Sequence, residues 1–557
     1  MMSDPMLTTP RVYGSWLRSL ARLARTRAGS SALQLALRAE LKIGELDKLP
    51  ASQFGTFPLH NRALSGRPPR RVEDLKLGAP RSGWAKQSVD FTSAYEARRT
   101  TPERILGRVL EAARELAART PAMPVLLDVA EDEARADAEA AGDRYRVGAP
   151  KGPLDGVCVA IKEQTCVRGL PAKGGTAFMD ASPRAEDATV VRRLREAGAI
   201  VVGTTPRTEY GMTPLGFNPH RKMPRNPHDT GHVAGGSSTG SGVAVATGLV
   251  PFATGVDGGG SIRIPSTVNG VFGIKPTWGR VSRAGDLFGG SVAHVGPIAN
   301  GTADLARMLE VIGAPDPRDP ETSAAPPLPS GSLVSALGRG VRGLRIGVED
   351  AEWADASTEV AKAGQEALRA LEKEGARLEK VSSPLMRHAP AIGYLAISIE
   401  TRADLKQEWL EHADDMTPDL QITMAVVQEL GAVEFAEALR LRAGLRREAA
   451  RMLGEVDLLA LPTTVATAPE VSDAQFESGF LDPQALAGLC RFNFFGNLTG
   501  LPAASAPVGL SGGLPIGLQL IGDAWDEATV LAACAHLERV GAASAQRPKV
   551  AVDVADF

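Results

Sequence analysis

Two serines in one glycine-rich stretch, Ser237 and Ser261, constrain this chain more than any other feature. The stretch reads Gly235-Gly236-Ser237-Ser238-Thr239-Gly240-Ser241-Gly242, continues as an apolar run, and ends in Asp257-Gly258-Gly259-Gly260-Ser261. Glycines let the backbone adopt positive φ and approach a ligand closely. Successive glycine N–H groups can also point at one oxygen, as an oxyanion hole requires. Taken alone, such a stretch is typical either of a flexible loop or of a serine-based catalytic site. Other parts of the sequence are needed to distinguish these two interpretations.

A lysine upstream favours the second interpretation. Lys162 ends the apolar, β-rich run Val157–Ile161, which is expected to be a buried strand. A lysine held in a dry interior is pushed toward its neutral form, because burial removes the solvation of the ammonium. A neutral amine can act as a base. Isolated lysines are mostly surface residues, so the argument depends on the place of Lys162 in that run.

The three pieces together resemble the amidase signature family of serine hydrolases. Four further blocks match the family in order: Thr189–Leu194 with Gly198–Gly203, Gly273–Ser282, and the closing strands at Asn497–Pro502 and Gly513–Gln519. The resemblance extends from about Val89 to about Leu537. It implies an α/β fold with a large mixed central β-sheet covered by helices on both faces.

The resemblance also implies a catalytic apparatus. Ser261 would be the nucleophile, Ser237 would relay its proton, and Lys162 would be the general base. The Gly236–Ser237 peptide would be cis. The N–H groups of Gly258, Gly259, Gly260 and Ser261 would form the oxyanion hole, and an acyl-enzyme on Ser261 would be hydrolysed by water. No metal or cofactor is implied.

Substrate recognition is less defined. Glu209 and Tyr210 align with the edge of the family's acyl pocket, although a single glutamate there could equally be a structural hydrogen-bond acceptor. The implied reaction is hydrolysis of a small carboxylic amide, with esters, anilides and carbamates chemically accessible. The alternative is a glutamine-hydrolysing subunit of a tRNA-dependent amidotransferase. A catalytically dead binding protein is disfavoured because all three catalytic positions are occupied.

Several residues depart from the family pattern without touching those three positions. Glu163 stands where aspartate is more common, Gly258 replaces a larger residue, and Asn269 stands where cysteine is common. Thr239 replaces a glycine, and a β-branched residue is costly if that position needs positive φ. These differences place the shape of the pocket in doubt.

Two competing motifs are weaker. Gly236-Ser237-Ser238-Thr239-Gly240 fits G-x-S-x-G, which would make Ser238 an α/β-hydrolase nucleophile, but a turn precedes it where a strand is needed. His228 and His232 have the spacing of zinc ligands on a helix, but the Pro/Gly-rich context disfavours a helix there. We therefore predict no metal site.

Composition excludes some classes of function. The net charge of −3 gives no electrostatic footprint for nucleic acid. No continuous apolar stretch reaches the length of about 18 residues that a transmembrane helix needs. The N-terminus does not read as a secretory signal, and four cysteines (Cys158, Cys166, Cys490, Cys534) suggest no disulfide framework. We expect a cytoplasmic enzyme in which Cys158 and Cys166 are buried packing residues.

Three regions are expected along the chain. Residues 1–84 form a helical extension. Its first helix has an apolar stripe, formed by Trp16, Leu20 and Leu23, and a basic stripe on another face, formed by Arg18, Arg22 and Arg25. A second helix covers about 31–46, and a Pro-rich link at 66–70 leads to the catalytic domain, 85–545. That domain includes a crossing loop at 314–332, a strand at 343–348 and a variable helical substrate entrance at about 390–452. Residues 546–557 form a tail.

The role of the extension stays open between two interpretations. A basic amphipathic helix within 14–46 can make peripheral contact with a membrane surface. The interpretation that we favour is a helical pair packed on the rest of the enzyme or at a homodimer interface.

Overall fold

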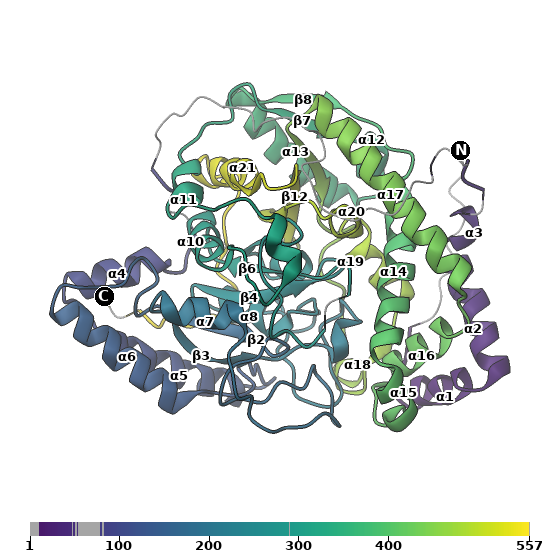
Figure 1. Ribbon diagram of the computed structural model, residues 1–557, viewed down its shortest axis with the longest axis horizontal. Coiled ribbons are helices and arrows are strands. Elements are labelled where there is room, and N and C mark those ends of the chain that lie inside the picture. Colours follow the sequence, from purple (N-terminus) through teal and green to yellow (C-terminus); the bar gives the residue numbers. More distant parts are fainter. Residues whose placement is uncertain are drawn as a thin grey trace.

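A mixed sheet forms the centre of the computed structural model, which describes residues 11–46, 48–50, 53, 78–80, 83–288, 290–555 and 557. Within these residues it has ten strands in the order β3-β2-β4-β6-β5-β11-β12-β9-β7-β8 (Figure 1). Their bounds are β2 Cys158–Lys162, β3 Ile200–Thr205, β4 Phe252–Asp257, β5 Phe272–Lys275, β6 His294–Ala299, β7 Arg345–Val348, β8 Arg377–Lys380, β9 Leu458–Pro462, β11 Ala503–Ser511 and β12 Leu514–Gly522.

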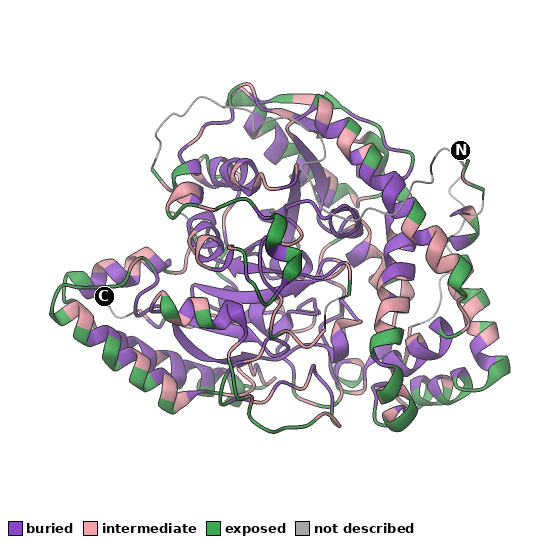
Figure 2. Ribbon diagram, viewed as in Figure 1, coloured by how far each residue is buried: buried purple, intermediate pink, exposed green. Residues whose placement is uncertain are grey.

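The two ends of the sheet are parallel and its middle is antiparallel. β2 pairs in parallel with β3 and β4, and β7 pairs in parallel with β8 and β9. Parallel neighbours need crossover connections, which are supplied by α7 (Thr189–Glu196) between β2 and β3 and by α13 (Thr358–Lys373) between β7 and β8. Helices cover both faces, as expected. Every residue of β2, β3 and β4 is therefore buried, and their sequences are mostly apolar (Figure 2).

Most predicted elements lie where the sequence places them. The sequence Thr101-Pro102-Glu103 begins a helix, α5 (Pro102–Ala118), and the Thr101 side chain caps it by accepting from the Arg104 N–H at 3.3 Å. The strand predicted at 343–348 is β7. The crossing loop at 314–332 contains one 3₁₀ turn at Pro320–Ala324.

One predicted strand is wrong. Asn497 lies in a helix, α20 (Phe494–Thr499), which ends at Gly500 with φ of +75°. Only glycine adopts that conformation easily, so it closes the helix. The strand β11 begins after it, at Ala503. The other closing block is a strand as predicted, β12.

The N-terminal residues pack on their own chain. Three helices follow the strand β1 (Val12–Tyr13), which pairs antiparallel with β10 (Phe480–Leu481): α1 (Gly14–Ala24), α2 (Arg27–Glu40) and α3 (Ile43–Leu46). The buried face of α1 contacts α16 (Pro418–Val427) through Leu17, Ala21, Ala24, Ile422, Ala425 and Val426. The exposed face carries Trp16, whose exposed fraction is 80%. The predicted link at 66–70 lies outside the described residues.

The region predicted as a substrate entrance is helical. It consists of α14 (Ala389–Asp404), α15 (Lys406–His412), α16 and α17 (Ala432–Glu455), with α14 and α17 side by side (Figure 1). The described residues of the predicted tail, 546–555 and 557, pack on the preceding chain, and the Val552 N–H donates to the Thr247 carbonyl at 2.8 Å. None of the helices in the described part of the chain has the length and apolarity needed to cross a membrane.

Candidate active site

Lys162 lies at the carboxyl end of β2 and its amine meets a serine hydroxyl. Its side chain has an exposed fraction of 0%. Lys162 Nζ lies 2.8 Å from Ser237 Oγ and donates to the Val256 carbonyl at 3.0 Å. The backbone N–H of Lys162 donates to Thr254 Oγ1 at 2.9 Å, which fixes the end of β2 against β4. Because parallel strands align their carboxyl ends, this edge of the sheet brings Lys162 next to the loop that follows β4.

The environment of Lys162 favours the neutral amine. Burial, and after it the charge of Arg207, holds the pKa of Lys162 well below its usual value, although the nearby carboxylates of Asp286, Asp257 and Glu163 act in the opposite direction. An uncharged Nζ has a lone pair available. It can therefore accept a proton from the Ser237 hydroxyl.

Ser237 lies in the turn that leads into α8 (Thr239–Ala246). The Gly236–Ser237 peptide bond is cis, as the resemblance implied. Thr239 begins the helix and is not among the residues with positive φ, so a side chain at this position carries no backbone penalty. The exposed fraction of Ser237 is 2%, yet the residue lines a pocket that Ser261 also lines.

Ser261 follows the glycine loop between β4 and α9 (Arg263–Val268). Gly258 and Gly259 line the pocket, and no acceptor among the described residues is recorded for their N–H groups or for that of Ser261. Gly260 differs, because its N–H donates to Asp257 Oδ1 at 2.7 Å. Its φ of +123° lies in the region that favours glycine, so Gly260 shapes the turn.

A fully buried ion pair holds this loop. Arg263 Nε and Nη2 donate to Asp257 Oδ2 and Oδ1, both at 2.9 Å. Asn497 Nδ2 donates to the same carboxylate at 2.9 Å. Burial would raise the pKa of Asp257, but the Arg263 charge and these hydrogen bonds outweigh it and hold the pKa well below its usual range. The block at 497–502 therefore supports the loop that carries Ser261.

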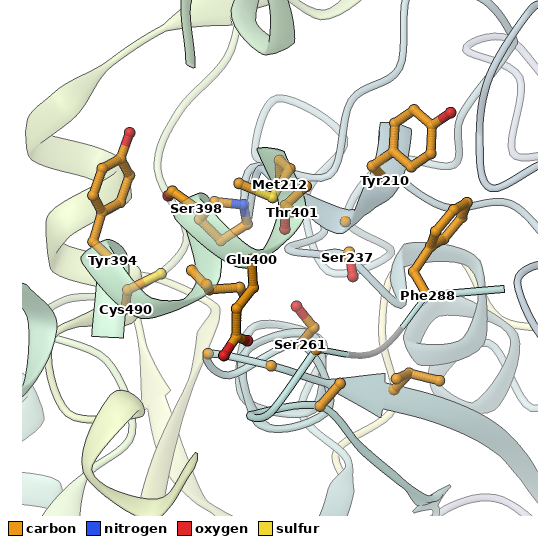
Figure 3. Close-up of a pocket in the computed structure, with 18 of the residues that line it drawn as sticks. Tyr210, Met212, Ser237, Ser261, Phe288, Tyr394, Ser398, Glu400, Thr401 and Cys490 are labelled. Atoms are coloured by element: carbon orange, nitrogen blue, oxygen red, sulfur yellow. The ribbon is translucent and has the colours of Figure 1, made fainter. Parts of the chain in front are cut away.

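The pocket between these residues has two different walls (Figure 3). Tyr210 and Phe288 lie beyond Ser237, whereas Tyr394, Ser398 and Glu400 of α14 lie on the other side of Ser261. The apolar part of the lining includes Met212, Ile264, Ile397, Leu405, Leu486 and Phe494. A Cβ on Gly258 would lie 2.9 Å from Ile397 Cδ1, so the glycine at this position leaves room for α14.

Comparison with known proteins identifies the family. A family model described as Amidase matches residues 108–531. This chain belongs to the amidase signature family. The fatty acid amide hydrolase of Medicago truncatula is 32% identical over 587 residues, covering 99% of this chain and 96% of that protein.

Two further amidase signature proteins are similar over most of the chain. A subunit of the glutamyl-tRNA(Gln) amidotransferase of Chloroflexus aggregans is 35% identical over 461 residues, covering 78% of this chain and 92% of that protein. The crystal structure of a bacterial aryl acylamidase of the family matches with a TM-score of 0.73 and 27% identity, covering 82% of this chain and 96% of the other. The fold and the hydrolase class follow from these matches.

Of the two residues predicted at the edge of the pocket, Tyr210 lies in its lining and Glu209 does not. Tyr210 lines the pocket and adopts a φ of +45°. Glu209 is not among the lining residues. Its carboxylate accepts from the Thr417 N–H at 2.7 Å and lies 3.2 Å from His220 Nε2. Glu209 thus connects the loop after β3 to the start of α16, which is the structural alternative that the sequence left open.

Other singled-out residues of the amidase are structural. Glu163 accepts from the N–H groups of Lys173 and Gly175 at 2.8 and 2.9 Å. Ser238 is fully buried and accepts from the Val256 N–H at 3.3 Å, which does not suit an exposed nucleophile. The Asn269 side chain donates to the Ala234 and Pro265 carbonyls. Within the described residues, no group of three His, Cys, Asp or Glu side chains could hold a metal ion.

Sequence reasoning missed part of the amidase pocket. Arg207 and Phe288 line it, as does Cys490, and none of them stood out as a motif. Cys158 is buried as expected, whereas Cys166 is only half-buried. The one available signal for Arg207 was its position two residues after the end of β3, because the carboxyl ends of parallel strands face the ligand site.

Proposed function

We propose that this hydrolase cleaves the C–N bond of a carboxylic amide through an acyl-enzyme on Ser261. The observation that carries the proposal is the 2.8 Å contact between Lys162 Nζ and Ser237 Oγ at the edge of a pocket lined by Ser237 and Ser261. As Ser261 Oγ attacks the carbonyl carbon, its proton passes to Ser237 Oγ, and the Ser237 proton passes to Lys162 Nζ. The return of these protons protonates the departing amine. Water then hydrolyses the ester on Ser261 by the same relay.

The negative charge of the tetrahedral intermediate needs donors already in place. We assign this role to the N–H groups of Gly258, Gly259 and Ser261, for which no acceptor is recorded among the described residues. Gly260 was predicted as a fourth donor. Since its N–H is committed to Asp257, its proposed contribution is the conformation of the turn.

The test is turnover by the purified chain alone. A panel of amides, anilides, esters and carbamates with graded acyl size should include compounds that are hydrolysed without a partner protein or cofactor. Release of the free carboxylic acid is followed by chromatography, with the Ser261→Ala variant as the control. If the wild-type chain hydrolyses no member of the panel, the proposal is wrong.

The second candidate is the glutamine-hydrolysing subunit of a tRNA-dependent amidotransferase, favoured by the 35% identity to a subunit of such an enzyme. That match covers 78% of this chain, whereas the match to the plant hydrolase covers 99% of it. The coverage favours the first proposal. Ammonia release from glutamine that appears only when partner subunits are added would support the second instead.

We further propose that residues 1–84 lie outside the chemistry of a cytoplasmic enzyme. Within 11–46, no residue lines the pocket. Trp16 and Leu23, with exposed fractions of 80% and 54%, lie on one side of α1, and the exposed arginines Arg18 and Arg22 lie on another. This exposed surface suits peripheral contact with an anionic membrane or with a second copy of the chain. Liposome flotation and sizing of the full chain separate the two roles.

A further inference from the structure

A buried arginine faces the same pocket and lacks a carboxylate partner. Arg207 follows β3, and its exposed fraction is 1%. Its Nη1 donates to Gln164 Oε1 at 2.5 Å and its Nε donates to the Thr208 carbonyl at 3.2 Å. Within the described part of the chain, no carboxylate oxygen lies within 4.0 Å of the guanidinium. A buried charge without a partner is strongly unfavourable, so its presence calls for a function.

The two carboxylates whose charges act most strongly on Arg207, those of Glu163 and Asp286, do not pair with it. Glu163 accepts two backbone hydrogen bonds and lies 3.6 Å from Arg221 Nη1. Asp286 accepts from Thr165 Oγ1 at 2.5 Å. Burial lowers the pKa of Arg207 to about 10, while the charges of Glu163 and Asp286 act against that shift. The guanidinium therefore stays charged at neutral pH and can attract an anion.

One end of the guanidinium points to the corner of the pocket beside Ser237. A Cβ placed on Gly211 would lie 2.6 Å from Arg207 Nη2 and 3.0 Å from Ser237 Oγ. Gly211 has a φ of +72° and no side chain, so both groups can approach its backbone closely from the same side. The guanidinium also lies 6.0 Å from the Phe288 ring centre, on the wall beyond Ser237 (Figure 3).

The position beside Ser237 indicates which half of a substrate Arg207 would meet. In the proposed mechanism, Ser237 delivers a proton to the departing amine, so the amine half lies on the Ser237 side. The acyl half then extends along the wall on the other side of Ser261, where α14 carries Tyr394, Ser398 and Glu400 and also contributes Ile397 to the lining.

We propose that Arg207 binds a carboxylate on the amine half of the substrate, and that the preferred substrates are therefore N-acyl amino acids. This inference rests on the proposed function. In an amino acid a single carbon separates the amine nitrogen from the carboxylate, which matches the proximity of Arg207 Nη2 and Ser237 Oγ around Gly211. A carboxylate there supplies the missing partner of the guanidinium and accepts a charge-assisted hydrogen bond.

The test compares two substrates with one acyl chain, N-decanoylglycine and N-decanoylglycinamide. They differ only in a carboxylate replaced by a carboxamide. For the wild-type chain, kcat/KM should be about 10–10²-fold higher for N-decanoylglycine, the size expected for a hydrogen bond between charged groups. Arg207→Met should bring the ratio close to one, and Arg207→Lys should restore part of it.

The matched control is Arg221→Met, which removes a neighbouring arginine that does not line the pocket. It should leave the ratio unchanged. A wild-type ratio near or below one overturns the proposal without any variant. So does an Arg207→Met variant that shifts the acid limb of the pH profile but keeps the ratio, because Arg207 would then act only on Lys162.

A binding experiment separates this proposal from the proposed function. Calorimetry on the Ser261→Ala variant measures the affinities for the same two compounds without turnover. Tighter binding of N-decanoylglycine, by about 10-fold or more, supports the role of Arg207 even if the wild-type chain hydrolyses neither compound. Equal affinities contradict it even if the chain is an active amidase.

Discussion

The carboxyl ends of two strands, β2 and β5, each place a lysine in the interior, and the two amines have different hydrogen-bond partners. Lys162 and Lys275 both have an exposed fraction of 0%, and burial is the main cause that holds the pKa of each well below its usual value. Lys162 Nζ meets the Ser237 hydroxyl. Lys275 Nζ donates to the Pro276 and Leu501 carbonyls.

In the proposed mechanism, this difference in partner separates a general base from a structural donor. A carbonyl oxygen carries no proton to give, so Lys275 can only hold the turn that connects α20 to β11. A serine hydroxyl can give its proton, and Ser237 lines the pocket. Burial thus favours the neutral form of each amine, but only an amine that contacts a hydroxyl can accept a proton from its partner.

The largest change in activity should come from removing the amine of Lys162, and removing the amine of Lys275 serves as the comparison. Lys162→Met should lower kcat/KM by about 10²–10⁴-fold, because the relay loses its general base. Lys275→Met should keep activity within about 10-fold, since the only role assigned to it is structural. Steady-state kinetics on one amide, with circular dichroism to show that both variants are folded, makes the comparison. Equal losses in the two variants would remove the distinction between the two strand ends.

The pH dependence of activity sharpens the same comparison. Because the neutral amine of Lys162 is the active form, kcat/KM should rise about 10-fold per pH unit below its pKa and then level off. The depressed pKa places this limb below the usual range of lysine. In Lys275→Met the limb should stay at the same pH. A profile of the wild-type chain that is flat from acid to alkaline pH contradicts a lysine base.

The stability of Lys275→Met should depend on pH with a defined sign. In the folded protein Lys275 is neutral at a pH where the unfolded lysine, with a pKa of about 10.4, is still protonated. The unfolded state binds the additional proton, so the stability of the wild-type chain rises with pH relative to the variant, by up to about 1.4 kcal/mol per unit. Urea unfolding of both proteins at several pH values measures this. A constant difference would mean that Lys275 is charged when folded.

The smallest effect is expected far from both strand ends. Deleting residues 1–84 should change turnover of a small soluble amide by less than about 10-fold, since residues 11–46 do not line the pocket. The deletion uncovers Ile422, Ala425 and Val426 of α16, so its thermal stability should fall. If the truncated chain is soluble and folded but inactive, the N-terminal residues contribute to the site.

The sequence singles out Lys162, Ser237 and Ser261, which lie close together in the structure, but not the other residues of the pocket, and the reason is physical. Lys162, Ser237 and Ser261 belong to local patterns, an apolar strand and glycine-rich turns, which fix the backbone within a few residues. The role of Glu209 depends on Thr417, which is 208 positions away. The pocket-facing direction of Arg207 depends on the turn after β3, and no periodicity in the sequence specifies such contacts.

The most direct test of the account is to map the serine that becomes covalently modified. A fluorophosphonate probe should label Ser261, and mass spectrometry of the digested protein should find the adduct on the peptide that contains Gly258–Ser261. Labelling should be lost in Ser261→Ala and greatly slowed in Lys162→Met, but retained in Lys275→Met. An adduct on Ser238 with Ser261 unmodified, or undiminished labelling of Lys162→Met, would contradict the account.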